Sequence, residues 1–112
     1  MGSLFSNNFT EEEMAQVQQI VEEIIKNNKI AVFSKSYCPY CKRAKEALRE
    51  LGEEFFVIEL DQDANGAAIQ QYLLDKTGQR TVPNIFINQQ HIGGCDSLLA
   101  AKNNGSLQKL LA

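Results

Sequence analysis

Hydrophobic and polar positions alternate along this chain with two different periods. From Met14 to Ile25, apolar residues recur every three or four positions, as on one face of an amphipathic helix. Thr10 and Glu13 stand at the spacing of a capping box, which marks the start of that helix. Residues 29–34 (KIAVFS) then form a short apolar run that predicts a buried strand. The period thus changes from helix to strand within the first third of the chain.

The later part of the chain continues this alternation. In order, it predicts a helix from Pro39 to Gly52, a strand over 55–60, a helix over 67–76, a hairpin at 82–87 and 91–92, and a last helical stretch capped by Asp96. Two strands joined by a crossover helix lie parallel, whereas the strands of a hairpin are antiparallel. The expected fold class is therefore α/β, with a mixed sheet of about four strands and helices on both faces.

No repeat or linker divides the sequence into separate units. Its 112 residues suit one domain with a single hydrophobic core. We expect residues 1–9 to form a flexible N-terminal segment and residues 10–112 to form the domain. Residues 1–6 match the pattern for N-myristoylation of Gly2, but a Met-Gly-Ser start is also a common cloning remnant, which is the simpler explanation.

The charge balance restricts the expected partners. A formal net charge of −3 at pH 7 does not favour nucleic acid or an anionic membrane, since phosphate groups are bound by surplus Lys and Arg. No apolar run approaches the roughly 20 residues of a membrane-spanning helix, and the N-terminus lacks the character of a leader peptide. We therefore expect a cytoplasmic monomer without stable membrane association, which acts on small molecules or other proteins.

The candidate chemistry lies in residues 38–41 (CPYC), between the first predicted strand and the second predicted helix. A helix N-terminus presents unpaired N–H groups and the positive end of a dipole, and both stabilise a thiolate. Lys35, Lys42 and Arg43 add positive charge nearby. Such surroundings lower the pKa of a cysteine and make its thiolate available at neutral pH. Cys38 is therefore the expected nucleophile.

Cys41 is the expected second thiol of the same pair. It falls on the inward, apolar face of the helix, so it should be less exposed and less acidic than Cys38. Its expected role is to attack a mixed disulfide at Cys38 and release the reduced product. The alternative of two inert buried thiols is disfavoured by the helix start and by the positive charges around it.

A zinc site is a different interpretation of the same cysteines. Cys38 and Cys41 could join His91 and Cys95 as four ligands of a tetrahedral zinc ion. However, residues 38–41 open a helix and do not form the Gly-rich knuckle that such sites favour, and His91 falls in the predicted hairpin. We therefore expect no metal.

Three segments resemble dithiol glutaredoxins of the CPYC type. They are residues 35–41 (KSYCPYC), 78–87 (GQRTVPNIFI) and 92–96 (IGGCD), which occur in the order of that family. Together they are far more specific than C-x-x-C alone, and the likeness runs from Ile30 to the end of the chain. The resemblance implies a thioredoxin fold, with Pro83 in the cis form beside the active site.

The resemblance also implies a site for glutathione, which would be the co-substrate. A cation suits the carboxylate of its glycine, main-chain groups suit its cysteinyl part, and a glycine allows its γ-glutamyl end to approach closely. The residues implied to meet these three parts of glutathione are, respectively, Lys35, Gln70 and Arg80; Thr81, Val82 and Pro83, flanked by Tyr40; and Gly94, Cys95 and Asp96.

The implied activity is the reduction of glutathione mixed disulfides by Cys38 and of protein disulfides by Cys38 with Cys41. Glutathionylated or disulfide-bonded proteins would be the partners, in cell redox homeostasis. A thioredoxin that ignores glutathione is the alternative within the fold, against which Tyr40 and residues 93–96 argue. A [2Fe–2S] cluster shared by two chains is disfavoured by Pro39. Cys95 is expected to pack, with glutathionylation or an interchain disulfide as alternatives.

Overall fold

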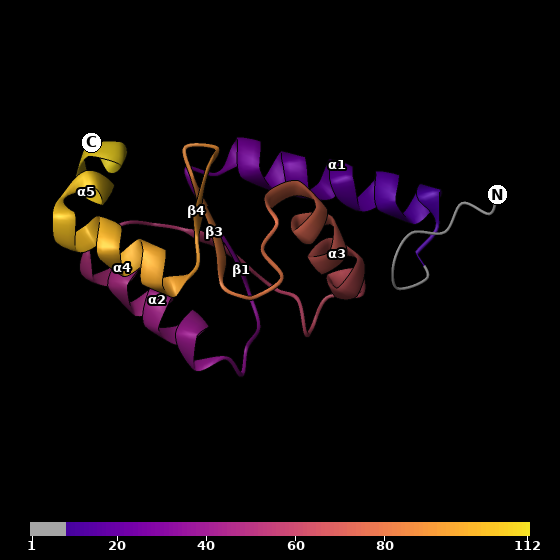
Figure 1. Cartoon of the computed structure of the whole chain (residues 1–112), viewed down its shortest axis with the longest axis horizontal. Helices are drawn as coiled ribbons and strands as arrows, with labels where there is room; N and C mark the ends of the chain where they lie inside the picture. The colour runs from indigo at the N-terminus through magenta and orange to yellow at the C-terminus, as the bar shows by residue number, and fades with distance from the viewer. Residues whose placement is uncertain (1–8) are drawn as a thin grey trace.

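The computed structural model describes residues 9–112, in which helices and strands alternate (Figure 1). In chain order the elements are α1 (Glu11–Asn27), β1 (Ile30–Ser34), α2 (Pro39–Glu50), β2 (Phe56–Glu59), α3 (Gly66–Thr77), β3 (Asn84–Ile87), β4 (Gln90–Gly93), α4 (Cys95–Asn104) and α5 (Ser106–Leu111). The expected order of elements is confirmed. The last helical stretch is divided in two at Gly105, whose φ of 86° ends α4.

The four strands form one mixed sheet in the order β2-β1-β3-β4. β1 runs parallel to β2 and antiparallel to β3, while β3 and β4 form the hairpin. Asn88 and Gln89 make the turn of that hairpin with φ angles of 50° and 68°, the positive values that a tight hairpin turn requires. β1 is therefore central, and its C-terminal end leads directly into the loop before Cys38.

Side chains of β1 alternate between two hydrophobic cores, one on each face of the sheet, so the expectation of a single core is wrong. Ala31 and Phe33 pack with α1 and α3 on one face of the sheet, and Ile30 and Val32 pack with α2, α4 and α5 on the other. Figure 1 shows these two groups of helices on opposite sides of the sheet. β1 is buried along its whole length, and its first four residues form the continuous apolar run that a strand covered on both faces requires. The expected sheet with helices on both faces is confirmed.

The helix ends follow the signals in the sequence. The capping box of α1 is present, with Thr10 N–H donating to Glu13 at 3.0 Å and Glu13 N–H donating to Thr10 Oγ1 at 3.1 Å. α2 begins at Pro39, where a helix does not need an N–H donor, and Cys38 is its N-cap. α3 ends at Gly78 with a φ of 79°, which glycine adopts without strain. The start of α2 positions Cys38, and the end of α3 leads directly into residues 79–83.

The start of β3 differs from the expected one. β3 begins at Asn84 and not at residue 82. The Val82–Pro83 peptide bond before it is cis, as the resemblance implied. Pro83 has no N–H to donate to a neighbouring strand, so residues 82–83 form a loop.

The start of α4 also differs from the expected one. Leu98 N–H donates to the Gly94 carbonyl oxygen at 3.0 Å, which closes the first turn and makes Gly94 the N-cap. The expectation that Asp96 is the cap is therefore wrong. Asp96 lies within the first turn, where its negative charge still faces the positive end of the helix dipole.

Phe9 belongs to the N-terminal segment expected to be flexible, yet its side chain is partly buried and packs against the hydrophobic core of α1 and α3. Gly2 and its myristoylation pattern lie outside the described residues.

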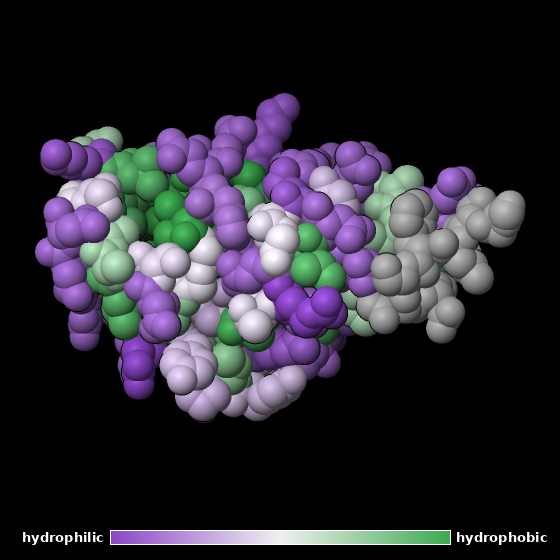
Figure 2. All heavy atoms as spheres, viewed as in Figure 1, coloured by the Kyte–Doolittle hydropathy of each residue, from purple (hydrophilic) through white to green (hydrophobic). Residues whose placement is uncertain are grey.

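Figure 2 shows mostly hydrophilic side chains over α1 and α3, and a hydrophobic area towards α4 and α5. Within residues 9–112, no helix combines the length and apolar character needed to cross a bilayer.

Candidate active site

Cys38 ends the loop after β1 and caps the first turn of α2. Its sulfur accepts a hydrogen bond from the Cys41 N–H at 3.4 Å, which is one of the N–H groups at a helix start that lack a partner within the helix. The thiol is half-buried, and Cys38 Sγ lies 3.8 Å from the carbonyl oxygen of Val82. A sulfur at this position meets the helix dipole and is open to a reactant, as a nucleophilic thiolate requires.

Cys41 lies one turn further along α2 and is 0% exposed. Burial raises the pKa of the Cys41 thiol because a charged sulfur would lose its hydration there, and the neighbouring Cys38 acts in the same direction. The Lys35 N–H, which donates to Cys41 Sγ at 3.5 Å, offsets part of this rise in pKa. Cys41 is therefore less exposed than Cys38 and less acidic than an ordinary thiol, in agreement with expectation.

The loop between β1 and Cys38 is tied to the segment after β2. The Asp61 carboxylate accepts hydrogen bonds from the Ser36 hydroxyl and from the Ser36 N–H, the latter at 2.9 Å. These two bonds lower the pKa of Asp61, and the positive charge of Lys35 contributes to the same shift. Cys38 N–H donates to the Lys35 carbonyl oxygen at 3.1 Å. The loop is thus fixed at both ends, which defines the position of Cys38.

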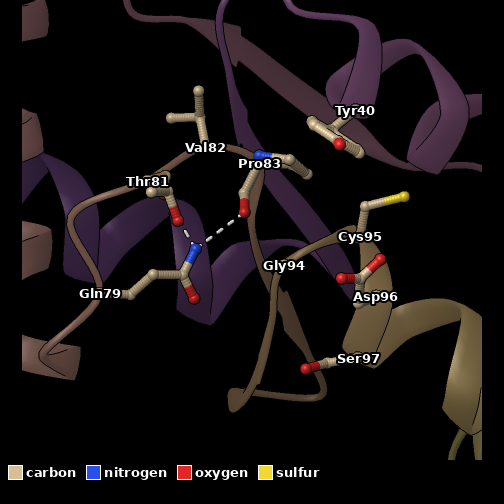
Figure 3. A pocket seen from close by; sticks show the side chains of 9 residues that line it. All are labelled: Tyr40, Gln79, Thr81, Val82, Pro83, Gly94, Cys95, Asp96 and Ser97. Carbon is tan, nitrogen blue, oxygen red and sulfur yellow. Dashed lines mark hydrogen bonds between the residues drawn. The ribbon is translucent and has the colours of Figure 1, made fainter.

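A groove of about 430 Å³ lies between three segments of the chain (Figure 3). Figure 3 shows the Tyr40 ring, the loop at 81–83 and the start of α4 arranged around it. Val82 connects the groove to the nucleophile, since its carbonyl oxygen is the one that lies near Cys38 Sγ. The residues that line the groove are Tyr40, Gln79, Thr81, Val82, Pro83, Gly94, Cys95, Asp96 and Ser97.

Gly94 and Tyr40 give the groove two different walls. A Cβ added at Gly94 would make ordinary contact, 3.6 Å from the Pro83 carbonyl oxygen, so the packing of the protein does not itself demand glycine there. The missing side chain leaves space that a bound molecule can use. On the other wall, the Arg43 guanidinium lies 5.8 Å from the centre of the Tyr40 ring, a cation–π contact that orients the ring.

Cys95 and Asp96 stand next to each other but in different surroundings. Cys95 is buried, and burial raises the pKa of its thiol. A buried neutral thiol is a poor nucleophile, which agrees with the expected packing role. Asp96 is exposed in the first turn of α4, where a charged ligand group can reach it.

Three of the predicted glutathione-binding residues lie outside this groove. Gln70 Nε2 donates to the Arg80 carbonyl oxygen at 2.9 Å, and both residues line a smaller hollow of about 170 Å³ against α3. Lys35 belongs to the loop before Cys38, with its charge near Asp61. The structure thus brings the other predicted residues together in one groove and leaves these three in segments adjoining it.

Two residues that line the groove, Gln79 and Ser97, were not predicted from the sequence. The Gln79 side chain donates hydrogen bonds to the carbonyl oxygens of Thr81 and Pro83. Ser97 follows Asp96 in the first turn of α4. Gln79 lies inside one of the segments that carry the family resemblance and Ser97 directly follows another, and this proximity is the signal that could have found them.

The four residues of the zinc alternative are not brought together. His91 Nε2 lies 2.8 Å from Asn84 Oδ1, and its ring centre lies 5.2 Å from that of Phe86. In the part of the chain that the structure describes, no three side chains of His, Cys, Asp or Glu are grouped so as to hold a metal ion. His91 therefore has a structural role in the hairpin.

The fold and the site together define a class of protein. A partly exposed thiol at a helix start, a buried second thiol in the next turn and a groove beside them are the parts of a thiol–disulfide oxidoreductase. Comparison with known proteins narrows this class. A family model described as Glutaredoxin matches residues 30–92.

Known relatives carry the same name. Glutaredoxin-1 of Rhizophagus irregularis is 59% identical over 99 residues, which cover 88% of this chain and 98% of that protein. Glutaredoxin-C1 of Arabidopsis thaliana is 47% identical over 112 residues, which cover 99% of this chain and 90% of that protein. The crystal structure of a buckwheat glutaredoxin–glutathione complex matches with a TM-score of 0.90 and 47% identity, covering 92% of this chain and 94% of that one.

These matches confirm the resemblance and the thioredoxin fold, and they set aside the thioredoxin alternative. The chain belongs to the glutaredoxin family. Its activity is glutathione-dependent thiol–disulfide oxidoreduction, with glutathione as co-substrate.

Proposed function

We propose that Cys38 is the nucleophile and that it removes glutathione from glutathionylated proteins. Its thiolate attacks the glutathione sulfur of the mixed disulfide, the S–S bond breaks, and the protein leaves as a thiolate that takes up a proton. Cys38 now carries the glutathionyl group. The thiolate of a second glutathione attacks that group, which releases glutathione disulfide and restores the Cys38 thiolate. This cycle needs one thiol of the enzyme.

Protein disulfides require both thiols in this proposal. The Cys38 thiolate attacks the substrate disulfide and forms a mixed disulfide with one substrate sulfur, while the other leaves as a thiol. Cys41 then loses its proton and attacks the Cys38 sulfur, which releases the reduced substrate and forms a Cys38–Cys41 disulfide. Two glutathione molecules reduce this disulfide and leave as glutathione disulfide.

The contrast between the two thiols is the observation that carries this division of roles. Cys38 Sγ is half-buried and lies 3.8 Å from Val82 O, at the groove. Cys41 is 0% exposed, and burial raises its pKa. A bulky protein disulfide can therefore reach Cys38 but not Cys41, and Cys41 acts only after the first exchange has brought a reactive sulfur to its neighbour.

Glutathione occupies the groove in this proposal, with its sulfur at Cys38. Main-chain groups of Thr81 and Val82 pair with its cysteinyl part, as a strand edge pairs with an added peptide. Asp96 and the start of α4 meet the amino and carboxylate groups of its γ-glutamyl end. The remaining proposed contacts are Lys35, Gln70 and Arg80 with the glycine carboxylate, and Tyr40, Pro83, Gly94 and Cys95 with the body of the ligand. The joint lining of one groove by most of these residues supports the proposal.

The proposed macromolecular partners are glutathionylated and disulfide-bonded proteins of the cytoplasm. A reducing compartment keeps both glutathione and the cysteines of this chain as thiols, and all three cysteines are free in the structure. Both thiols and the whole groove come from one chain, so a monomer suffices for the reaction.

Glutathione-dependent reduction of a mixed disulfide, coupled to glutathione reductase, tests the proposal. Cys38→Ser should lose turnover with glutathionylated peptides and with protein disulfides alike. Cys41→Ser should keep the first activity and lose the second. Equal loss of both activities in Cys41→Ser would contradict the division of roles, and activity in Cys38→Ser would contradict the nucleophile.

A further inference from the structure

The side chain of Gln79 bridges two carbonyl groups of the cis-proline loop. Its Nε2 donates hydrogen bonds to Thr81 O and to Pro83 O, each at 2.9 Å (Figure 3). An amide nitrogen carries two hydrogens, so both are used within the loop. Gln79 therefore lines the groove, but its nitrogen has no hydrogen left to donate to a bound molecule.

The carbonyl group between these two has a different partner. Val82 O lies 3.8 Å from Cys38 Sγ, which in its thiol form is placed to donate to it. With Thr81 O and Pro83 O directed to Gln79, the intervening carbonyl is directed to the nucleophile. Pro83 has no N–H, so the regular hydrogen bonds of a strand cannot hold this loop. The Gln79 amide supplies hydrogen bonds in their place.

Gln79 is itself anchored to α3 and to β3. Its N–H donates to Thr77 Oγ1 at 3.0 Å, and the Thr77 hydroxyl donates to the Leu73 carbonyl oxygen within α3 at 2.8 Å. Asn84 Nδ2, at the start of β3, lies 3.4 Å from the same Thr77 oxygen. These contacts connect the loop to two rigid elements, and such support is what holds a binding segment in place.

Gln79 also lies between the loop and the glycine turn before α4. A Cβ on Gly94 would stand 4.0 Å from Gln79 Nε2, and a Cβ on Gly93 would stand 3.8 Å from Gln79 Oε1. The amide is therefore close to both segments that form this side of the groove. Figure 3 shows it between the backbone at 81–83 and the backbone at Gly94.

We propose that Gln79 is a positioning residue for glutathione, because its amide fixes the backbone at 81–83 so that Val82 meets the cysteinyl part of the ligand beside Cys38. This inference rests on the proposed function of the groove. Loss of the amide removes the donor from Thr81 O and Pro83 O, and the loop then turns these oxygens towards water. Substrate binding weakens, whereas the Cys38 thiolate, which α2 stabilises, does not change.

Gln79→Met tests the inference because methionine keeps the length of the side chain and removes the amide. We expect KM for a glutathionylated peptide to rise about tenfold and kcat to change by less than about twofold. Alkylation of Cys38 by iodoacetamide, which needs no glutathione, should keep the wild-type rate. The matched control is Gln19→Met on the exposed side of α1, which should behave as the wild type in all three measurements.

NMR relaxation of the ligand-free protein separates positioning from direct binding. Gln79→Met should lower the backbone order parameters of Thr81 and Val82 in the absence of glutathione, whereas loss of a direct ligand contact would leave them unchanged. A folded variant with wild-type KM and wild-type order parameters overturns the inference and leaves the proposed function standing. A wild-type protein without glutathione-dependent turnover would instead overturn the proposed function.

A second variant keeps the test decisive if Gln79→Met does not fold. Gln79→Asn retains an amide but is one methylene too short to reach both carbonyl oxygens. It should raise KM and lower the order parameters in the same direction as Gln79→Met. Wild-type values in a folded Gln79→Asn would overturn the inference.

Discussion

The two sides of the active site are built in different ways. The thiol side, residues 35–41, is one continuous segment that consists of a loop and the first turn of α2. The groove side combines the segment 79–83, in which Gln79 bridges two carbonyl groups, with the later segment 94–97, and residues of both segments line the groove. A reactive thiol thus requires little more than the local chemistry of a helix start. A ligand groove requires contacts between distant parts of the chain.

Cys38→Ser should separate the two sides most strongly. The serine hydroxyl stays protonated at neutral pH, so glutathionyl transfer should fall by at least about a thousandfold. The groove side is unaltered, so the Kd of S-methylglutathione, which has no free thiol, should stay within about twofold of the wild-type value. Steady-state turnover and titration calorimetry measure the two quantities. A large loss of binding would show that the two sides are not independent.

The elements of the fold and their order along the chain could be predicted from local signals. The capping box at Thr10, the proline at position 39 and the glycine at position 78 mark helix ends, and changes of period locate the strands. Features that depend on tertiary contacts could not be predicted from the sequence. α3 begins at Gly66, where a Cβ would lie 1.7 Å from the Leu60 carbonyl oxygen. No periodicity indicates so close an approach between a helix and the preceding segment.

The site divides in the same manner. The difference between Cys38 and Cys41 follows from their places on one helix turn, so elementary rules predict it. The groove is assembled by the register of the sheet, in which Ile85 pairs with Gly93, and its residues could be named only through the family resemblance. Gln79 was missed because a glutamine in a loop looks the same in a sequence whether water or two carbonyl groups accept its hydrogen bonds.

The buried thiol should give the two reactions different pH dependences. Burial raises the pKa of Cys41, and below that pKa its thiolate fraction grows about tenfold for each pH unit. From about pH 6 to pH 8, single-turnover release of a reduced protein substrate by the prereduced enzyme should therefore rise more than about tenfold relative to single-turnover transfer of the glutathionyl group from a peptide to Cys38. Rapid-mixing assays without added glutathione measure this ratio, because ionisation of glutathione would otherwise raise both steady-state turnovers with pH.

Cys41→Ser is the control for this pH dependence. It should remove glutathione from the peptide with the pH profile of the wild type, because that cycle does not use Cys41. A ratio that stays constant with pH in the wild type would contradict a step that depends on ionisation of the buried thiol.

Gly94→Val should disturb the groove side alone. The added side chain enters space proposed for glutathione, so KM for a glutathionylated peptide should rise about fivefold. The backbone at Gly94 (φ −97°, ψ −165°) is extended and accepts any residue. The Tm of thermal unfolding should therefore fall by no more than a few degrees, which is the expected effect of replacing the N-cap glycine. Alkylation of Cys38 should keep its rate. Ala100→Val on the exposed side of α4 is the matched control, and an unchanged KM in Gly94→Val would remove Gly94 from the site.

Asp61→Asn should have the smallest effect on reactivity. It weakens a tertiary contact of the thiol side, residues 35–41, and the reactivity of that side depends mainly on the local start of α2. Asparagine keeps the size and one acceptor oxygen, so one of the two hydrogen bonds from Ser36 survives. The lowered pKa of Asp61 means that the wild-type carboxylate stays charged throughout the neutral range. We expect alkylation of Cys38 to slow by no more than about twofold, since α2 still stabilises the thiolate.

Asp63→Asn is the matched control for this change, because Asp63 lies in the same exposed segment and accepts a hydrogen bond from Asn65 N–H at 2.8 Å without touching the loop before Cys38. It should leave the alkylation rate at the wild-type value. A tenfold or larger loss in Asp61→Asn, with Asp63→Asn unaffected, would show that the reactive thiol depends on tertiary contacts as strongly as the groove does. The proposed difference between the two sides, a thiol determined by local sequence and a groove assembled from distant segments, would then be wrong for the thiol.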